Sequence, residues 1–252
     1  MAISNTTYTY FVSGKVYFRQ YGSEKAFEFP GLVDQISLAV SEQVVNLQDR
    51  TAPGGGNYDQ VRRIESASLT MAVREFRPTV LEKVLFGTNS PVASGTESAE
   101  EHVATKGGFI PLDHPGPYTN VSVTDDATSP QPIGQAGNYE VVPGGIQILE
   151  DATDIDDDDV IRVTYTYPDY QRVEALTSGA PELELIFVGQ NEARNDSQVR
   201  VRIHRVRLGA PTDKQLLSAD DFGSLDLTGE VLKDTSITAQ GSSQYWYEDI
   251  VG

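Results

Sequence analysis

Two stretches of the sequence carry residue types that could bind an ion or a phosphate. The acidic run DATDIDDDDVIRV (151–163) offers closely spaced carboxylates, and calcium takes about six to eight oxygen ligands of this kind. The run lacks the glycine and the glutamate of a calcium-binding loop, and Val160, Ile161 and Val163 begin a strand directly after the aspartates. We therefore predict a solvated turn, with an ion at 151–159 as the alternative.

The stretch PGGGNYDQVRR (53–63) places consecutive glycines behind a proline, which resembles the composition of a phosphate-binding loop. Such loops need GxxxxGK[ST], or GxGxxG between a strand and a helix, because backbone N–H groups and a helix N-terminus bind the phosphate. This stretch has neither a lysine nor a following helical pattern. It predicts the tip of a hairpin instead.

The one basic stretch is VRVRIHRVRL (199–208), in which Arg200, Arg202 and His204 share a strand face. The alternation slips at Arg205, which predicts a bulge. Nucleic-acid binding is one interpretation, but no interleaved aromatic platform accompanies the arginines. We expect cross-strand or inter-subunit ion pairs with acids on neighbouring strands, the candidates being Glu182, Glu184, Glu65, Glu75 and Asp226.

No pattern for catalysis is present. His102, His114 and His204 lie far apart in unlike contexts, and neither HExxH nor GxSxG occurs. The chain has no cysteine, which excludes disulfides, thiolate metal sites and cysteine nucleophiles. We predict no catalytic, cofactor-binding or metal-binding residues, and the protein is not expected to be an enzyme.

The composition favours a soluble, acidic protein. Its 252 residues suffice for one large domain or two small ones, and the formal net charge is -18. MAISNTTYTYFVSGK (1–15) lacks the pattern of a signal peptide, and no apolar run approaches the ~20 residues that span a bilayer, so we expect cytosolic synthesis and no membrane contact. The charge disfavours adhesion to DNA, and it also serves solubility.

Period-two alternation with turn residues between the runs predicts a mainly β, antiparallel protein. Residues 14–22 form a short strand, and 27–47 and 58–76 form one long hairpin around the glycines. At ~3.3 Å per residue its limbs reach about 40 Å, so the arm at 41–66 must project beyond its own core. Two helices are expected, at 76–87 with Pro78 in the first turn and Gly87 as cap, and at 211–222.

The composition changes after the first helix. Residues 88–108 are small and polar, which is typical of a linker, and 109–170 contain four strand candidates. We therefore predict a core domain built from 1–90 and 172–252, with 91–171 as an inserted linker and small β domain.

Three segments in order, SGKVYF (13–18), FPGLVDQ to KVLFG (29–87) and LELIFVGQ to VLKD (183–234), resemble the major tail tube protein of long, non-contractile-tailed bacteriophages. The resemblance covers about 1–90 and 172–252, and the insert resembles an Ig-like or decoration-type domain. It implies a tail-tube-type antiparallel β-sandwich or barrel with one flanking helix. It also implies hexameric rings that stack into a tube around a tape-measure protein.

The resemblance further implies contacts with tail-tip and terminator proteins, passage of double-stranded DNA without specific binding, and a place in the virion tail after assembly in the host cytoplasm. It makes the hairpin an inter-subunit arm, carried by Asp49, Arg50, Thr51, Pro53, Gly54, Gly55, Gly56, Asn57, Tyr58, Arg62 and Arg63. Strand alternation makes four acids candidates for the lumen wall, namely Asp34, Glu42, Asp226 and Glu230.

Two alternatives remain open at this stage. A capsid decoration or tail-terminator protein would share the β character and the acidity but would form a single ring or a trimer. A carbohydrate-binding β-sandwich could use the aromatic run QYWYED, in which Tyr245, Trp246 and Tyr247 would supply a stacking platform.

Overall fold

The structure is a computed structural model that describes residues 9–51, 53–211, 213–217 and 222–251. The fold is mainly β with antiparallel sheets, as predicted, and the described part contains one α-helix. The chain divides into two compact units. The first combines the chain up to Thr88 with the chain from Val173 onward, and the second is Asn89–Arg172, close to the range 91–171 expected for the insert.

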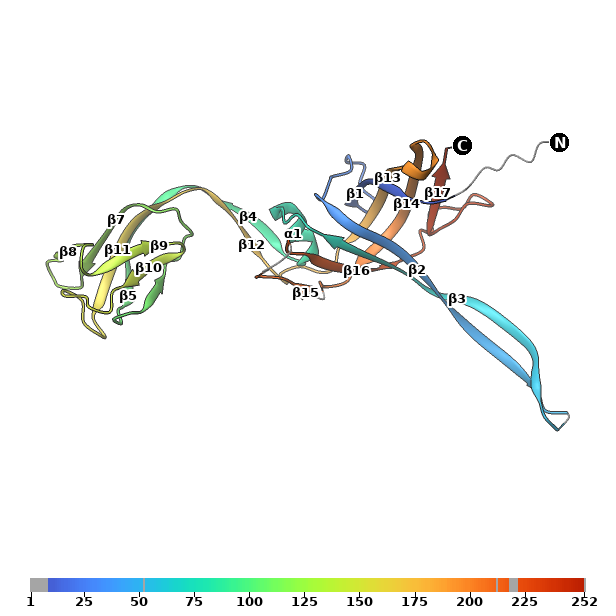
Figure 1. The fold of residues 1–252 in the computed structure, drawn as a ribbon, viewed down its shortest axis with the longest axis horizontal. Coiled ribbons are helices and arrows are strands. Elements are labelled where there is room, and N and C mark those ends of the chain that lie inside the picture. Colours follow the sequence, from blue (N-terminus) through green and yellow to red (C-terminus); the bar gives the residue numbers. More distant parts are fainter. Residues whose placement is uncertain (1–8, 52, 212, 218–221, 252) are drawn as a thin grey trace. The chain divides into compact units, whose positions relative to one another are not determined.

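The first unit contains a sheet in the order β1-β13-β14-β16-β3-β2, with β17 added to β14 and β15 to β16 (Figure 1). Its strands are β1 (Val12–Gln20), β2 (Val33–Asp49), β3 (Gly56–Val73), β13 (Glu182–Asn191), β14 (Ser197–Leu208), β15 (Asp213–Lys214), β16 (Leu225–Val231) and β17 (Trp246–Ile250). A short 3-10 helix, Glu192–Arg194, connects β13 to β14.

The sheet curls over itself. Val16 and Phe18 of β1 belong to the same buried cluster as Leu69 and Met71 of β3, although β1 and β3 lie near opposite ends of the strand order. One edge of β14 is shared by two strands, because its first half pairs with β17 and its last residues pair with β16. Between these two parts the register of β13 against β14 shifts, which confirms the bulge predicted at Arg205.

Helix α1 (Pro78–Val84) covers this core with Val80 and Val84. Its C-terminus differs from the prediction that Gly87 is the cap. Phe86 takes the left-handed conformation, with φ of 51°, and the Gly87 N–H donates to the carbonyl of Glu82. Gly87 has another role, since a Cβ there would lie 2.3 Å from the carbonyl oxygen of Glu174.

The second predicted helix, 211–222, is wrong for the residues of that range that the structure describes. Asp213 and Lys214 form β15, which pairs with Asp226 and Leu225 of β16. The two leucines that would have formed an apolar stripe, Leu216 and Leu217, are 84% and 94% exposed. A helix without a buried face loses the packing that stabilises most helices in proteins, so the chain pairs with an available strand edge instead. Residues 212 and 218–221 lie outside the described part.

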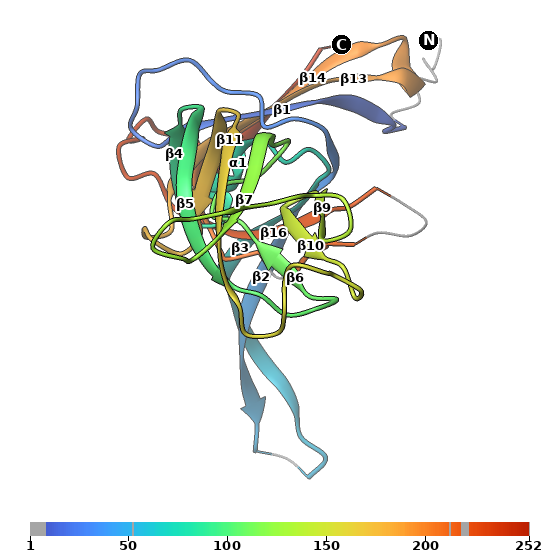
Figure 2. The same cartoon turned by 90° about the vertical axis from the view of Figure 1, so that its left-hand side faces the viewer.

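The second unit has two small sheets around its own core, in the orders β5-β11-β7-β8 and β6-β10-β9. Figure 2 shows β5, β11 and β7 side by side. The strands are β5 (Gly95–Val103), β6 (Phe109–Pro111), β7 (Thr119–Asp125), β8 (Pro132–Ile133), β9 (Tyr139–Val142), β10 (Gly145–Ile148) and β11 (Val160–Tyr167).

The expectation that 88–108 is a linker is wrong for most of its length. Residues 95–103 form β5, which pairs along one edge with β11. The sequence GTESAEEHV has no apolar alternation because much of this edge strand faces solvent. The two chain segments at the boundary of the units, β4 (Thr88–Val92) and β12 (Tyr170–Glu174), pair as a two-stranded sheet.

Within the described ranges, no helix has the length and apolar character needed to cross a membrane.

Candidate functional site

The most unusual feature of the first unit is the outer part of the β2–β3 hairpin, residues 41–66, which we call the arm. Strand β3 pairs with β16 only over Ser68–Val73, whereas β2 and β3 pair with each other as far as Asp49 and Gly56. Figure 1 shows these two strands continuing past the other strands of their sheet. Among the described residues, therefore, both outer edges of the arm lack a neighbouring strand.

The tip of the arm is a turn closed by short-range hydrogen bonds. The Asp49 carboxylate accepts hydrogen bonds from the Thr51 hydroxyl, at 2.6 Å, and from the Thr51 N–H, at 2.8 Å, and these bonds lower the pKa of Asp49. Gly54 and Gly55 have φ of 110° and 51°, conformations that side chains disfavour. Strand β3 follows at Gly56, and with no helix N-terminus there the turn lacks the arrangement that binds phosphate.

The charged residues of the arm are only partly paired. Arg62 lies 3.5 Å from Glu42 across the two strands, and both side chains are exposed. In the described part of the chain, Arg50 and Arg63 form no ion pair within their own copy. Positive charge is thus available at the arm in an otherwise acidic protein.

The arm also exposes large apolar side chains on both faces. Val45 lies directly opposite Val61, so these two share a face, and Leu47 lies two residues along the same side. Val44 and Ile64 occupy the other face, because they alternate with the first set. All the large apolar groups of the arm are exposed to solvent: Val44, Val45, Leu47, Tyr58, Val61 and Ile64.

The structure separates the four acids predicted for a lumen wall. Asp34 pairs with Arg74 at 3.0 Å, and Glu42 belongs to the arm, where it pairs with Arg62. Asp226 and Glu230 both lie on the exposed face of β16, which alternates with the buried leucines of that strand. Thr228 shares this face of β16, and across β3 and β2 the face continues with the small polar side chains of Ser68, Thr70 and Ser37.

The basic strand β14 pairs with acids, as expected. Glu184, which is buried, accepts hydrogen bonds from Arg19 and Arg202, each at 2.6 Å. Glu182 accepts two from Arg205, at 2.8 and 2.9 Å, and also contacts Arg207. The Arg205 guanidinium is the main cause that lowers the pKa of Glu182. Glu75 was also expected to pair with an arginine of β14, but it pairs with Arg77 instead.

The acidic run and two of the histidines lie in the second unit. Asp154 accepts a hydrogen bond from Asn138, and Asp156 pairs with Lys106 at 2.9 Å. His114 stacks on Tyr167 with ring centroids 3.7 Å apart, and His102 lies 2.8 Å from Glu100. In the ranges that the structure describes, no three or more His, Asp or Glu side chains are grouped to hold a metal ion.

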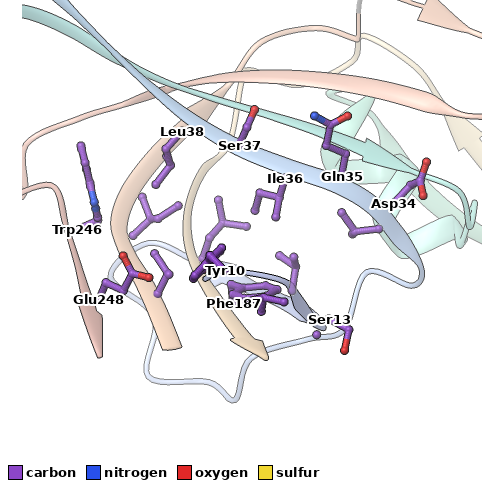
Figure 3. Close-up of a pocket in the computed structure, with 17 residues that line it drawn as sticks. Tyr10, Ser13, Asp34, Gln35, Ile36, Ser37, Leu38, Phe187, Trp246 and Glu248 are labelled. Atoms are coloured by element: carbon purple, nitrogen blue, oxygen red, sulfur yellow. The ribbon is translucent and has the colours of Figure 1, made fainter. Parts of the chain in front are cut away.

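The feature that the sequence interpretation missed is an apolar cleft of about 610 Å³ in the first unit. Figure 3 shows Ile36 and Leu38 of β2 pointing across it toward Phe187, with Trp246 and Glu248 of β17 at one end. Trp246 and Tyr245, proposed above for stacking on sugars, meet at 65°, so they do not form one flat platform. Tyr247 contacts His204 instead.

These features define a two-unit, mainly β protein with one projecting hairpin and an incompletely covered core. The chain belongs to the family described as Protein of unknown function UCP028589, whose family model matches residues 9–248. A search of curated proteins found no match to the chain.

Proposed function

We propose that this chain is a structural protein of a bacteriophage virion that self-assembles into stacked rings, which form the tube of a long, non-contractile tail. The observation that carries the proposal is the arm, residues 41–66, a two-stranded ribbon with free edges and exposed apolar groups on both faces. An isolated hairpin is marginally stable in water. The arm is therefore best explained as a segment that another copy covers.

The arm also favours a tube over a closed dimer. A projecting segment that binds a different surface on the next copy makes a head-to-tail contact, and such contacts give closed rings or open filaments. Exposed strand edges would otherwise be an aggregation hazard, and charged side chains such as Glu42, Arg62 and Arg63 limit it.

The exposed face of β2, β3 and β16 suits the wall of a conduit for double-stranded DNA. It carries Asp226 and Glu230 among small hydroxyl side chains, and over 33–40, 67–73 and 225–231, outside the arm, it presents no arginine or lysine. Phosphate binding depends on Lys and Arg, so this face would let DNA pass without holding it. Tape-measure, tail-tip and terminator proteins are the further partners of this role, and assembly would take place in the host cytoplasm.

Negative-stain electron microscopy of concentrated full-length protein tests the proposal. We expect hollow tubes for the unchanged chain, and monomers with an unchanged circular dichroism spectrum after deletion of residues 51–57. Deletion of 127–130, in the exposed loop between β7 and β8, is a matched control that should still form tubes.

Other outcomes distinguish the alternatives. A single ring or a trimer in light scattering at every concentration would contradict the tube and favour a decoration or terminator protein. A monomer that binds an oligosaccharide array would favour the carbohydrate-binding alternative.

A further inference from the structure

The apolar cleft is an opening into the hydrophobic core of the first unit. Its floor is formed by side chains that are otherwise fully packed, Val16, Leu185 and Ile203. Its walls are Ile36 and Leu38 on β2 and Phe187, Val201 and Trp246 on the strands opposite, all only partly buried. A volume of about 610 Å³ lies within the ~300–1,000 Å³ of typical ligand pockets, so it can hold several aliphatic side chains.

The charge at the cleft is acidic. Asp34 and Glu248 are the charged residues among those that line it, and Asp34 is already paired with Arg74. No arginine or lysine of the described residues pairs with Glu248. Glu248 faces Tyr10, whose pKa is raised by burial and by the nearby Glu248 carboxylate. An occupant of this cleft should therefore be apolar and carry one positive charge at its margin.

One face of the arm has this chemistry. Val45 and Val61 form a cross-strand apolar pair, Leu47 continues the apolar surface, and Arg63 lies on the same face without an acidic partner in its own copy. The same face carries an acid, Asp59, opposite Leu47 and nearer the tip than the Val45–Val61 pair. The ribbon also has the right form for a gap between strands, because a pair of strands can pack on a sheet at about 10 Å.

The arm cannot fill the cleft of its own copy. Strand β2 is continuous from Val33 to Asp49 and stays paired with β3 along its length, so the same strand forms both the cleft wall and the arm. At ~3.3 Å per residue, Leu47 lies about 36 Å along the strand from Ile36. The occupant must come from a second copy.

We propose that the arm of one copy inserts into the apolar cleft of a second copy, so that Val45, Leu47 and Val61 complete its core and Arg63 meets Glu248. This inference rests on the proposed self-assembly and names the surface that receives the arm. The contact is head-to-tail, since each copy offers one arm and one cleft, and it therefore propagates from copy to copy.

Disulfide cross-linking between two single-cysteine variants tests the contact, because the unchanged chain has no cysteine. Val61→Cys protein is mixed with Leu38→Cys protein under assembly conditions and oxidised mildly. Ser37→Cys is the matched control partner, since Ser37 neighbours Leu38 but its hydroxyl lies 2.6 Å from the Thr70 hydroxyl, on the other face of the sheet from Leu38 (Figure 3). We expect at least about tenfold more mixed dimer with Leu38→Cys, because docking holds the two thiols at a high effective concentration.

The outcomes separate this inference from the proposed function. Tubes that form normally but give equal or no cross-linking with the two partners would overturn the docking and leave the tube intact. Absence of any polymer from the unchanged chain would overturn both proposals. A Val61→Cys and Leu38→Cys cross-link in preference to the control supports both.

Trp246 gives a second measurement that needs no cysteine, because it is the single tryptophan of the chain and lines the cleft. On assembly we expect a blue shift of its emission and weaker quenching by acrylamide. Val45→Asp should abolish both changes, whereas Asn46→Asp, which adds the same charge on the other face of the arm, should keep them. Unchanged quenching in assembled wild-type protein, or the same protection in the dilute monomer, would overturn the inference.

Discussion

The two halves of the β2–β3 hairpin share the same strands but lie in different environments. In the inner half, Leu69 and Val73 are 1% and 0% exposed, and β16 pairs with the edge of β3. In the arm, Val61 and Ile64 are 49% and 59% exposed, and the described residues provide no third strand. Apolar and polar residues alternate in the inner half, whereas the arm carries apolar side chains on both faces, and neither face is covered.

Because of this difference, we expect the inner half to serve the folding of one copy and the arm to serve association between copies. The inner half buries its apolar face within one copy, so its side chains contribute to the stability of the monomer. The apolar side chains of the arm gain little from folding because they remain in water. Their burial awaits another copy, and their substitution should therefore affect assembly far more than it affects folding.

The largest expected effect is on the free energy of unfolding, when an apolar residue of the inner half is truncated and compared with one of the arm. Leu69→Ala should destabilise the monomer by about 2–5 kcal/mol, because it removes packed methyl groups and leaves a cavity. Val61→Ala should change the free energy of unfolding by less than ~0.5 kcal/mol, because its side chain is exposed. Urea denaturation of dilute protein measures both. Equal losses from the two substitutions would mean that the arm is part of the monomer core.

An intermediate effect is expected from pH, through an ion pair between β13 and β14 of the packed sheet, compared with one in the arm. Arg205 and Arg207 lower the pKa of Glu182 from its usual value of 4.5. A lowered pKa in the folded state means that Glu182 stabilises the protein above about pH 4.5 and loses this contribution as the pH falls through the folded pKa. Glu182→Gln should therefore lower the urea midpoint at about pH 7 and not at about pH 2–3.

Glu42→Gln in the arm is the control for this pH effect. Its partner Arg62 is 3.5 Å away and both side chains are exposed, so the substitution should leave the midpoint unchanged at either pH. If Glu182→Gln had the same effect at both pH values, the loss would come from packing and not from the charge of the carboxylate.

The sequence was sufficient for those features that depend on local pattern. Alternating apolar residues around Leu69 and Met71 predicted the long hairpin, and the broken alternation at Arg205 predicted the bulge of β14. Helix α1 followed from Pro78 and its apolar stripe. Each of these features depends on residues that are close together in the chain, so it can be predicted from a single sequence.

Features that depend on tertiary contacts escaped prediction. Strand β5 has no apolar alternation and exists because β11 offers an edge, and Leu216 and Leu217 form no helix because no surface covers them. The cleft joins Ile36, Phe187 and Trp246 from distant parts of the chain, and their approach depends on how far the sheet curls. The arm residues were predicted from the hairpin and its glycines, but the cleft that we propose for them had no signal in the sequence.

The smallest effect is expected at the tip of the arm, from adding a methyl group to either of two nearby glycines. Gly54 has φ of 110°, which strains any side chain, whereas Gly56 lies outside the left-handed region, and a Cβ at either position meets no atom within 4 Å. Gly54→Ala should speed hydrogen exchange of the arm amides by up to about tenfold, because the strained turn opens more often. Gly56→Ala should leave the exchange rates unchanged.

Neither substitution should change the free energy of unfolding by more than ~0.5 kcal/mol, because the turn lies outside the core. If the amides around Leu69 also exchanged faster in Gly54→Ala, the two halves of the hairpin would unfold as one unit. That result would contradict the expectation that the arm opens independently of the inner half.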